Sequence, residues 1–399
     1  MNRKILPILR EKLRERLDSA REYKDEEILE LIDELIIEEC RNYGVSFKEK
    51  TSLRMELFHG IRKLDILQDL LEDESITEIM VNGPEHIFIE RYGKIQPFDR
   101  TFASREKLED VIQQIVGKCN RVVNESRPIV DARLETGERV NAVIAPVALN
   151  GPILTIRRFP ATPITMEWLI RKGSITQEAA RFLKEAVEAH YTILIGGGTG
   201  SGKTTFLGAL CGFISPGERL ITIEDSAELQ IQGIENLVRL EAKMANLEGG
   251  MEVSIRDLIK ASLRMRPNRI IVGEVRGAEA VDMLQALNTG HEGSISTIHA
   301  NSGRDMLSRL ETMILMGMNL PLEAIRRQMV SGVDLLVYLG RLGDGSRKVL
   351  EITEVLDYRE GEIRTENLFK YSQKTGLQKT GSLINCEKME RKGSSEKRL

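Results

Sequence analysis

The segment TILIGGGTGSGKTT, residues 192–205, decides the fold of this chain. An apolar, strand-like run leads into residues 197–204, which match the pattern G-x-x-x-x-G-K-[ST] at every fixed position. Glycines in such a loop leave backbone N–H groups free to surround phosphates, and the N-terminus of a following helix favours negative charge. The segment therefore predicts a P-loop between a buried strand and a helix that begins near Lys203.

The residue types in this loop predict its ligand. Lys203 carries the charge that neutralises the β- and γ-phosphates, and the hydroxyl of Thr204 is a ligand suited to Mg²⁺. We therefore expect ATP and Mg²⁺ as cofactors. The predicted nucleotide-binding residues are Gly197, Gly198, Thr199, Gly200, Ser201, Gly202, Lys203, Thr204 and Thr205.

Two other apolar runs end in carboxylates. RIIVGE, residues 269–274, ends in Glu274, and LITIED, residues 220–225, ends in Glu224 and Asp225. The carboxyl ends of parallel strands meet at the sheet edge where ligands bind. We expect Glu274 to act on Mg²⁺, directly or through a water, while either Glu224 or Glu274 polarises the attacking water.

Two of the chain's five histidines, His291 and His299, lie close together in GHEGSISTIHA. Their spacing does not bring both onto adjacent turns of a helix, and no cysteine is near, which argues against a zinc site. We expect both histidines to sense the nucleotide phosphates through hydrogen bonds.

The pattern of apolar residues divides the chain into regions. Residues 166–358 alternate between strand-like and helix-like segments, which predicts an α/β domain whose parallel sheet is covered on both faces. Residues 71–159 mix strands with a helix and predict an α+β domain. The expected remainder is a helical accessory region at 1–70, a Pro-containing linker at 160–165 and a C-terminal extension at 359–399 that ends in a disordered basic tail.

Composition excludes several classes of protein. No apolar run approaches the roughly 18 residues of a membrane-spanning helix, and charges interrupt the first residues before a signal-peptide core can form. The four cysteines are far apart, which argues against a disulfide framework and fits a reducing cytoplasm. A net charge of −4 and only 5% aromatic residues argue against nucleic acid as the main partner.

The four motifs together resemble the secretion-superfamily ATPases of type II and type IV secretion and type IV pili. They are GGGTGSGKTT, ITIEDSAEL, IIVGEVRG and GHEGSISTIHAN, in the order that this family uses. The flanking segments EIMVNGPEHIFIERYGKI and DARLETGERVNAVIAPVALNGPILTIRRF look most like the CpaF-like branch, the motor of the Tad (tight adherence, Flp) pilus. The resemblance covers about residues 65–358, and the scattered cysteines exclude the tetracysteine zinc module of some relatives.

This resemblance implies a RecA-like ATPase domain behind the α+β domain, assembled into a homohexamer with nucleotide between the domains. It implies that Arg139 and Arg157 reach the γ-phosphate, with Arg158 as the competing choice beside Arg157. Glu224, Glu274, His291 and His299 complete the expected catalytic set. The implied function is an ATP-hydrolysing motor for Tad or type IV-like pilus assembly or protein secretion. The motor would act in the cytoplasm of a bacterium or archaeon, peripheral to the inner membrane through a platform protein.

Two other functions fit the same motifs. One is a conjugation-type secretion ATPase of the type IV systems. The other is a RecA-like hexameric nucleic-acid translocase, against which the acidic charge and the scarcity of aromatic residues argue.

Overall fold

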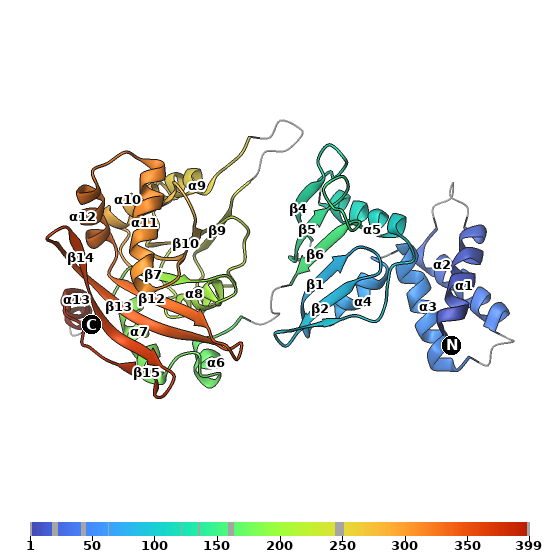
Figure 1. Ribbon diagram of the computed structural model, residues 1–399, viewed down its shortest axis with the longest axis horizontal. Coiled ribbons are helices and arrows are strands. Elements are labelled where there is room, and N and C mark those ends of the chain that lie inside the picture. Colours follow the sequence, from blue (N-terminus) through green and yellow to red (C-terminus); the bar gives the residue numbers. More distant parts are fainter. Residues whose placement is uncertain are drawn as a thin grey trace. The chain divides into compact units, whose positions relative to one another are not determined.

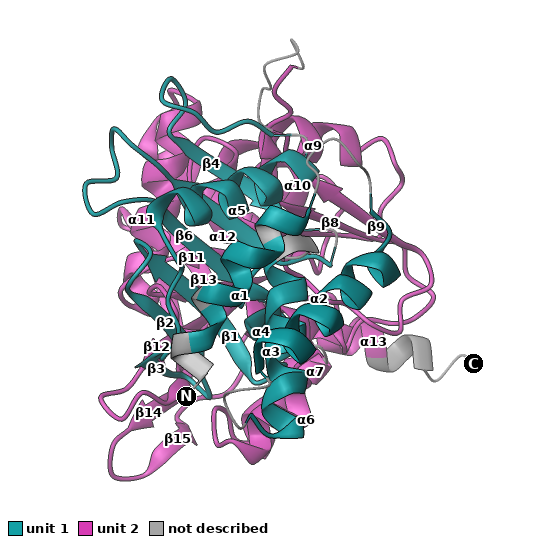
Figure 2. Ribbon diagram, turned by 90° about the vertical axis from the view of Figure 1, so that its right-hand side faces the viewer, with its two compact units in different colours: residues 1–161 teal, residues 162–399 magenta. Residues whose placement is uncertain are grey.

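The computed structural model describes residues 2–17, 23–40, 45–62, 64–119, 121–134, 136–158, 163–243 and 251–396. The chain divides into two compact units, Met1–Ala161 and Thr162–Leu399 (Figure 2). The division falls at the Pro-containing segment 160–165 for which we expected a linker, and residues 160–162 of that segment lie outside the described residues.

Unit 1 begins with helices that share a small core of their own. Helices α1 (Asn2–Arg16), α2 (Asp25–Glu39) and α3 (Phe47–Arg62) pack against one another (Figure 1). Their buried residues recur at three- and four-residue spacing, as in Ile28, Ile32 and Leu35 of α2. The helical region predicted from the sequence is thus a compact bundle.

The rest of unit 1 is an antiparallel sheet covered by helices on one face. Its described strands run in the order β3-β2-β1-β6-β5-β4. Helices α4 (Ile66–Glu72) and α5 (Arg105–Lys118) bury apolar side chains against the sheet, and Ser104 caps α5 by accepting from Lys107 N. The strands are β1 (Ile76–Asn82), β2 (Ile87–Arg91), β3 (Lys94–Pro97), β4 (Ile129–Arg133), β5 (Arg139–Val143) and β6 (Ile153–Arg157).

Unit 2 is built on one large sheet. Its described strands run in the order β15-β14-β13-β12-β7-β11-β10-β8-β9, and β12, β7, β11, β10, β8 and β9 are mutually parallel. The parallel strands are β7 (Ile193–Gly197), β8 (Leu220–Glu224), β9 (Leu237–Glu241), β10 (Arg269–Val275), β11 (Ile295–His299) and β12 (Leu335–Arg341). The antiparallel strands are β13 (Arg347–Arg359), β14 (Glu362–Ser372) and β15 (Gly376–Lys379).

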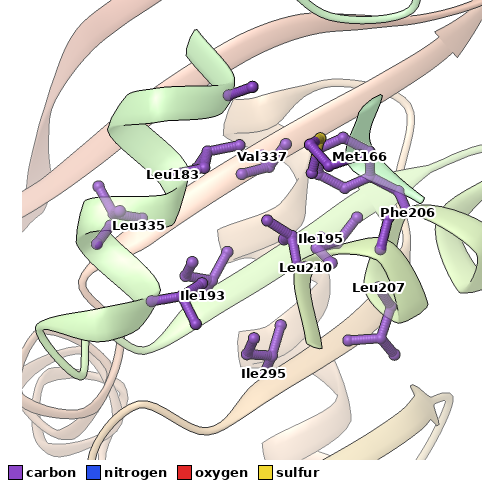
Figure 3. Packing of buried hydrophobic residues seen from close by; sticks show 14 of the residues in the cluster. Met166, Leu183, Ile193, Ile195, Phe206, Leu207, Leu210, Ile295, Leu335 and Val337 are labelled. Carbon is purple, nitrogen blue, oxygen red and sulfur yellow. The ribbon is translucent and has the colours of Figure 1, made fainter. Parts of the chain in front are cut away.

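Helices bury both faces of this sheet. Ile193 and Ile195 of β7 point into the core on one face, beside Leu183 and Phe206 (Figure 3). Leu194, between them, belongs to the core on the other face. The first core includes α6 (Met166–Arg171), α7 (Gln177–Glu188) and α8 (Lys203–Cys211); the second includes α9 (Ile255–Ser262), α10 (Ala280–Asn288), α11 (Gly303–Gly317) and α12 (Leu322–Gly332). The predicted α/β fold, with a covered sheet and an α+β domain before it, is confirmed.

The C-terminal part differs from its prediction. Where we expected an extension at 359–399 with a disordered basic tail, β14 and β15 continue the sheet in antiparallel fashion beyond β13, and a last helix, α13 (Glu387–Glu396), follows. Residues 397–399 of the predicted tail lie outside the described residues. Glu354 is buried and accepts hydrogen bonds from the backbone N–H groups of Ile384 and Asn385, while Lys388 Nζ lies 2.7 Å from Asp334 Oδ2. Partners distant in sequence therefore order a segment whose composition alone predicts disorder.

Across the part of the chain that the structure describes, no helix is both long enough and apolar enough to span a membrane.

Candidate functional site

The P-loop joins β7 to α8 as the sequence predicts. At three of its glycines, Gly197, Gly200 and Gly202, the backbone conformation or a close neighbour disfavours any residue with a Cβ. Gly200 and Gly202 have φ of 70° and 92°, a region that residues with a Cβ rarely occupy. A Cβ on Gly197 would lie 2.6 Å from the carbonyl oxygen of Leu339. Thr204 and Thr205 lie in the first turn of α8. The loop therefore has the conformation that presents backbone N–H groups and the helix N-terminus to phosphate.

Lys203 is almost buried, with 8% of its side chain exposed. Its Nζ donates to the carbonyl oxygens of Gly197 and Gly198 at 3.1 and 3.2 Å, and lies 3.8 Å from Glu274 Oε1. Burial lowers the pKa of Lys203, an effect that the Glu274 carboxylate opposes. The ammonium is thus held at the P-loop and partly compensated by an acid.

Glu224 ends β8 beside β10 and is 3% exposed. Its Oε2 accepts from the N–H groups of Glu228 and Leu229, at 2.7 and 2.9 Å, whereas its buried Oε1 meets no hydrogen-bond donor among the described residues. Burial raises the pKa of Glu224. A Cβ on Gly273 would lie 2.8 Å from Glu224 Cγ, so the glycine before Glu274 makes room for this carboxylate.

Glu274 and His299 meet beside Lys203. His299 Nε2 lies 2.7 Å from Glu274 Oε1, and His299 Nδ1 lies 3.4 Å from Lys203 Nζ. Burial lowers the pKa of His299, and Lys203 adds to this effect while Glu274 opposes it. The register of β11 against β7 pairs His299 with Gly197, which explains why this histidine reaches the P-loop.

His291 does not join this cluster. It precedes β11, and its Nδ1 lies 3.3 Å from the carbonyl oxygen of Ala286. Because β11 and β7 are parallel and His299 pairs with Gly197 at their carboxyl ends, His291 belongs to the opposite edge of the sheet. Within unit 2 only His299 lies beside the P-loop, so the expectation that both histidines lie at the nucleotide site is corrected for His291.

The arginines predicted to act on the nucleotide lie in unit 1. Arg139 of β5 pairs directly with Arg157 of β6, and Arg133 of β4 pairs with Arg139, so three arginines form one row across three strands. Arg158 instead donates to the carbonyl oxygens of Asp73 and Ile76. Arg157 is exposed, whereas the guanidinium of Arg158 is used inside unit 1.

The sequence patterns did not predict two arginines that lie next to predicted site residues, Arg347 at the P-loop and Arg133 in the row of Arg139 and Arg157. Arg347, at the start of β13, donates from Nε to the P-loop carbonyl oxygen of Gly200 at 2.9 Å. Arg133 enters the arginine row only through the register of β4 and β5. Neither carries a local motif: a side-chain hydrogen bond reveals Arg347, and strand pairing reveals Arg133.

Comparison with known proteins shows to which family the chain belongs. The type II/IV secretion system protein family matches residues 62–378, which include the sheet of unit 1, the P-loop and the two acids predicted to be catalytic, Glu224 and Glu274. The chain belongs to this family. With its complete P-loop and the acids at the same sheet edge, it is an ATP-hydrolysing member of the type II/IV secretion family.

Two curated proteins are similar to this chain over most of their length. The putative conjugal transfer protein Rv3659c of Mycobacterium tuberculosis (strain ATCC 25618 / H37Rv) is 37% identical over 75% of this chain and 86% of its own. The type IV secretion system protein PtlH of Bordetella pertussis (strain Tohama I / ATCC BAA-589 / NCTC 13251) is 35% identical over 75% of this chain and 94% of its own. These similarities support a secretion or conjugation ATPase and do not single out the Tad branch that the flanking segments suggested.

A solved structure shares the fold. The pilus retraction motor PilT with bound ADP superposes with a TM-score of 0.52 at 19% identity, over 84% of this chain and 88% of PilT. This likeness supports the fold described here.

Proposed function

We propose that this chain is the ATP-hydrolysing motor of a conjugation-type or type IV secretion machine. The observation that carries the proposal is its similarity to a putative conjugal transfer protein and a type IV secretion protein over 86% and 94% of their lengths. In this proposal the chain works as a homohexamer at the cytoplasmic face of the inner membrane, docked on a platform protein of the machine.

The proposed site holds ATP with Mg²⁺. The hydroxyl of Thr204, in the first turn of α8, and the Glu274 carboxylate near Lys203 are groups that suit Mg²⁺ in a P-loop. When bound, the ion neutralises charge on the β- and γ-phosphates. In the structure, the ammonium of Lys203 donates to the carbonyl oxygens of Gly197 and Gly198, and in the proposed complex it would turn to the same phosphates.

Glu224 is the acid we propose for the attacking water. Its Oε2 is fixed by two backbone N–H groups, and its buried Oε1 has no donor among the described residues. A water is the natural partner for such an oxygen, because a buried acceptor without a hydrogen bond is costly. Glu274, beside Lys203 and His299, suits the cation, and His299 suits the γ-phosphate.

Arg139 and Arg157 are proposed to stabilise the transferred phosphate. Arg139 lies directly opposite Arg157, where like charges repel each other, and the residue paired with Arg157 on its other side is Glu78 of β1. A guanidinium that meets developing negative charge lowers the barrier more than it strengthens ground-state binding. Arg158 is left out of this role because its guanidinium binds carbonyl oxygens within unit 1.

Lys203→Ala tests the motor and the machine together. In purified protein, we expect ATP turnover to fall by about 100-fold or more, because the phosphates lose their fixed cation. In cells that lack the native gene, the variant should fail to restore DNA transfer or protein export, while the wild-type chain restores it. A variant with more than half of the wild-type rate would contradict the site.

The second candidate function is the motor of a Tad-like pilus. It is favoured by the segments EIMVNGPEHIFIERYGKI and DARLETGERVNAVIAPVALNGPILTIRRF, which resemble the CpaF-like branch. Assays in the cells that lack the native gene distinguish the two candidate functions. Loss of surface pili with unaltered DNA transfer and protein export would replace the first proposal by the second, and DNA-stimulated ATP turnover would favour a nucleic-acid translocase.

A further inference from the structure

Arg276 holds two acidic side chains that come from neighbouring strands. Its Nε donates to Glu274 Oε2 at 2.7 Å, and its Nη2 donates to the same oxygen. Its Nη1 lies 3.4 Å from Oδ2 of Asp225, the residue that follows β8. Because β8 and β10 are parallel neighbours, one guanidinium spans the carboxyl ends of both strands.

The turn that carries Arg276 is fixed separately from its side chain. Glu279 Oε1 accepts hydrogen bonds from the backbone N–H groups of Arg276 and Gly277, at 2.6 and 2.8 Å. The side chain of Arg276 is 61% exposed, so packing does not determine where the guanidinium lies. The two carboxylates and the pinned turn determine it instead.

The contacts of Glu274 show what this bridge controls. Its Oε1 faces Lys203 at 3.8 Å and His299 at 2.7 Å, while its Oε2 is taken by Arg276. Without the guanidinium, the Glu274 carboxylate could turn both oxygens to Lys203 and draw that ammonium from the phosphates. Asp225 and Glu274 would also lose the cation that lies between them, at a site for an anionic nucleotide.

We propose that Arg276 is a positioning residue for ATP hydrolysis, which bridges Asp225 to Glu274 and so fixes Glu274 with one oxygen toward Lys203 and His299. This inference rests on the ATPase site described above. The planar fork of arginine suits the task, because it donates to two carboxylates in fixed directions, whereas lysine is a single point charge.

The test compares Arg276→Gln, Arg276→Lys, Asp225→Asn and the double variant Asp225→Asn/Arg276→Gln in the full chain. We expect Arg276→Gln to lower kcat by about tenfold or more, because small misplacements of a catalytic group are costly. KM for ATP, and the affinity for a fluorescent ADP analogue measured in EDTA, should stay within about threefold. Arg276→Lys should recover only part of kcat. The control is Arg327→Gln, which removes an exposed arginine paired with Glu323 on α12.

The double variant tests the bridge itself. As a single change, Asp225→Asn should lower kcat. In the double variant it should add little to the loss that Arg276→Gln causes, because both changes break the same Asp225–Arg276–Glu274 bridge. An unaltered kcat in Arg276→Gln, an equal loss of ADP affinity, full recovery in Arg276→Lys, or independent effects of the two changes would overturn the proposal. A wild-type chain without ATP turnover would instead overturn the ATPase assignment, and this inference with it.

Discussion

Gly273 determines where the Glu224 carboxylate can lie. A Cβ at this position would come within 2.8 Å of Glu224 Cγ, and Glu224 is held by backbone N–H groups that leave it little room to move. We therefore expect Gly273→Ala to lower kcat by about tenfold or more, while ADP affinity changes little. Steady-state ATPase assays and nucleotide titration check this. Gly217→Ala is the matched control, since a Cβ there meets no atom within 4 Å; equal rates in both variants would contradict the prediction.

The ionisation of Glu224 gives a second expectation at the residue scale. Burial raises the pKa of Glu224 above the ordinary value of 4.5, and a carboxyl group must be ionised to accept a proton from water. As pH falls, the proposed base is therefore protonated, and kcat lost, at a higher pH than for an exposed glutamate. A pH profile of kcat should have its acid limb above pH 4.5, with circular dichroism confirming the fold at each pH. A rate that stays flat down to pH 4.5 would exclude Glu224 as the base.

At the scale of the element, the position of a residue at the end of strand β6 gives Arg157 and Arg158 different contacts. Neighbouring residues on a strand face opposite sides, so Arg157 joins the row of Arg139 and Arg133 while Arg158 binds the carbonyl oxygens of Asp73 and Ile76. We expect Arg157→Ala to slow ATP hydrolysis by about 10³-fold or more and to leave ATP affinity nearly unaltered.

Arg158→Ala should have the reverse effect. It removes donors that two backbone carbonyl oxygens use, so it should lower the melting temperature of unit 1. ATPase rates measured beside thermal unfolding separate the two variants. If Arg157→Ala hydrolyses ATP at the wild-type rate, the role of the arginine row is wrong, although the P-loop site still stands.

The separate helical core bears on the whole molecule. Helices α1–α3 bury their apolar residues in a cluster distinct from the one beneath the sheet, and the family match begins only at residue 62. We expect deletion of residues 1–60 to leave the rest folded, hexameric and active in ATP hydrolysis, yet impaired in export. Light scattering after size-exclusion chromatography, ATPase assays and an export assay check the three parts. A monomeric truncated protein would show that the bundle is needed for assembly.

The sequence by itself determined the P-loop, the alternation of strands and helices around it, and the acids at the carboxyl ends of β8 and β10, Glu224 as the last residue of β8 and Glu274 one residue before the end of β10. These features are local: a glycine pattern, a hydrophobic period and a charge after an apolar run are written in consecutive residues. The caps of α5 and α9 are local in the same sense, because Ser104 and Ser254 each accept a hydrogen bond from a backbone N–H three residues along the chain.

Only the tertiary structure decided which distant residues meet. Parallel pairing placed His299 by the P-loop and His291 at the opposite edge, and antiparallel pairing aligned Arg133 with Arg139 and Arg157. The order of the C-terminal segment likewise depends on Glu354 and Asp334, which no local composition reveals. Register and long-range hydrogen bonds join residues that are far apart in the chain, so the physical cause of each contact lies in the folded sheet and not in the neighbouring sequence.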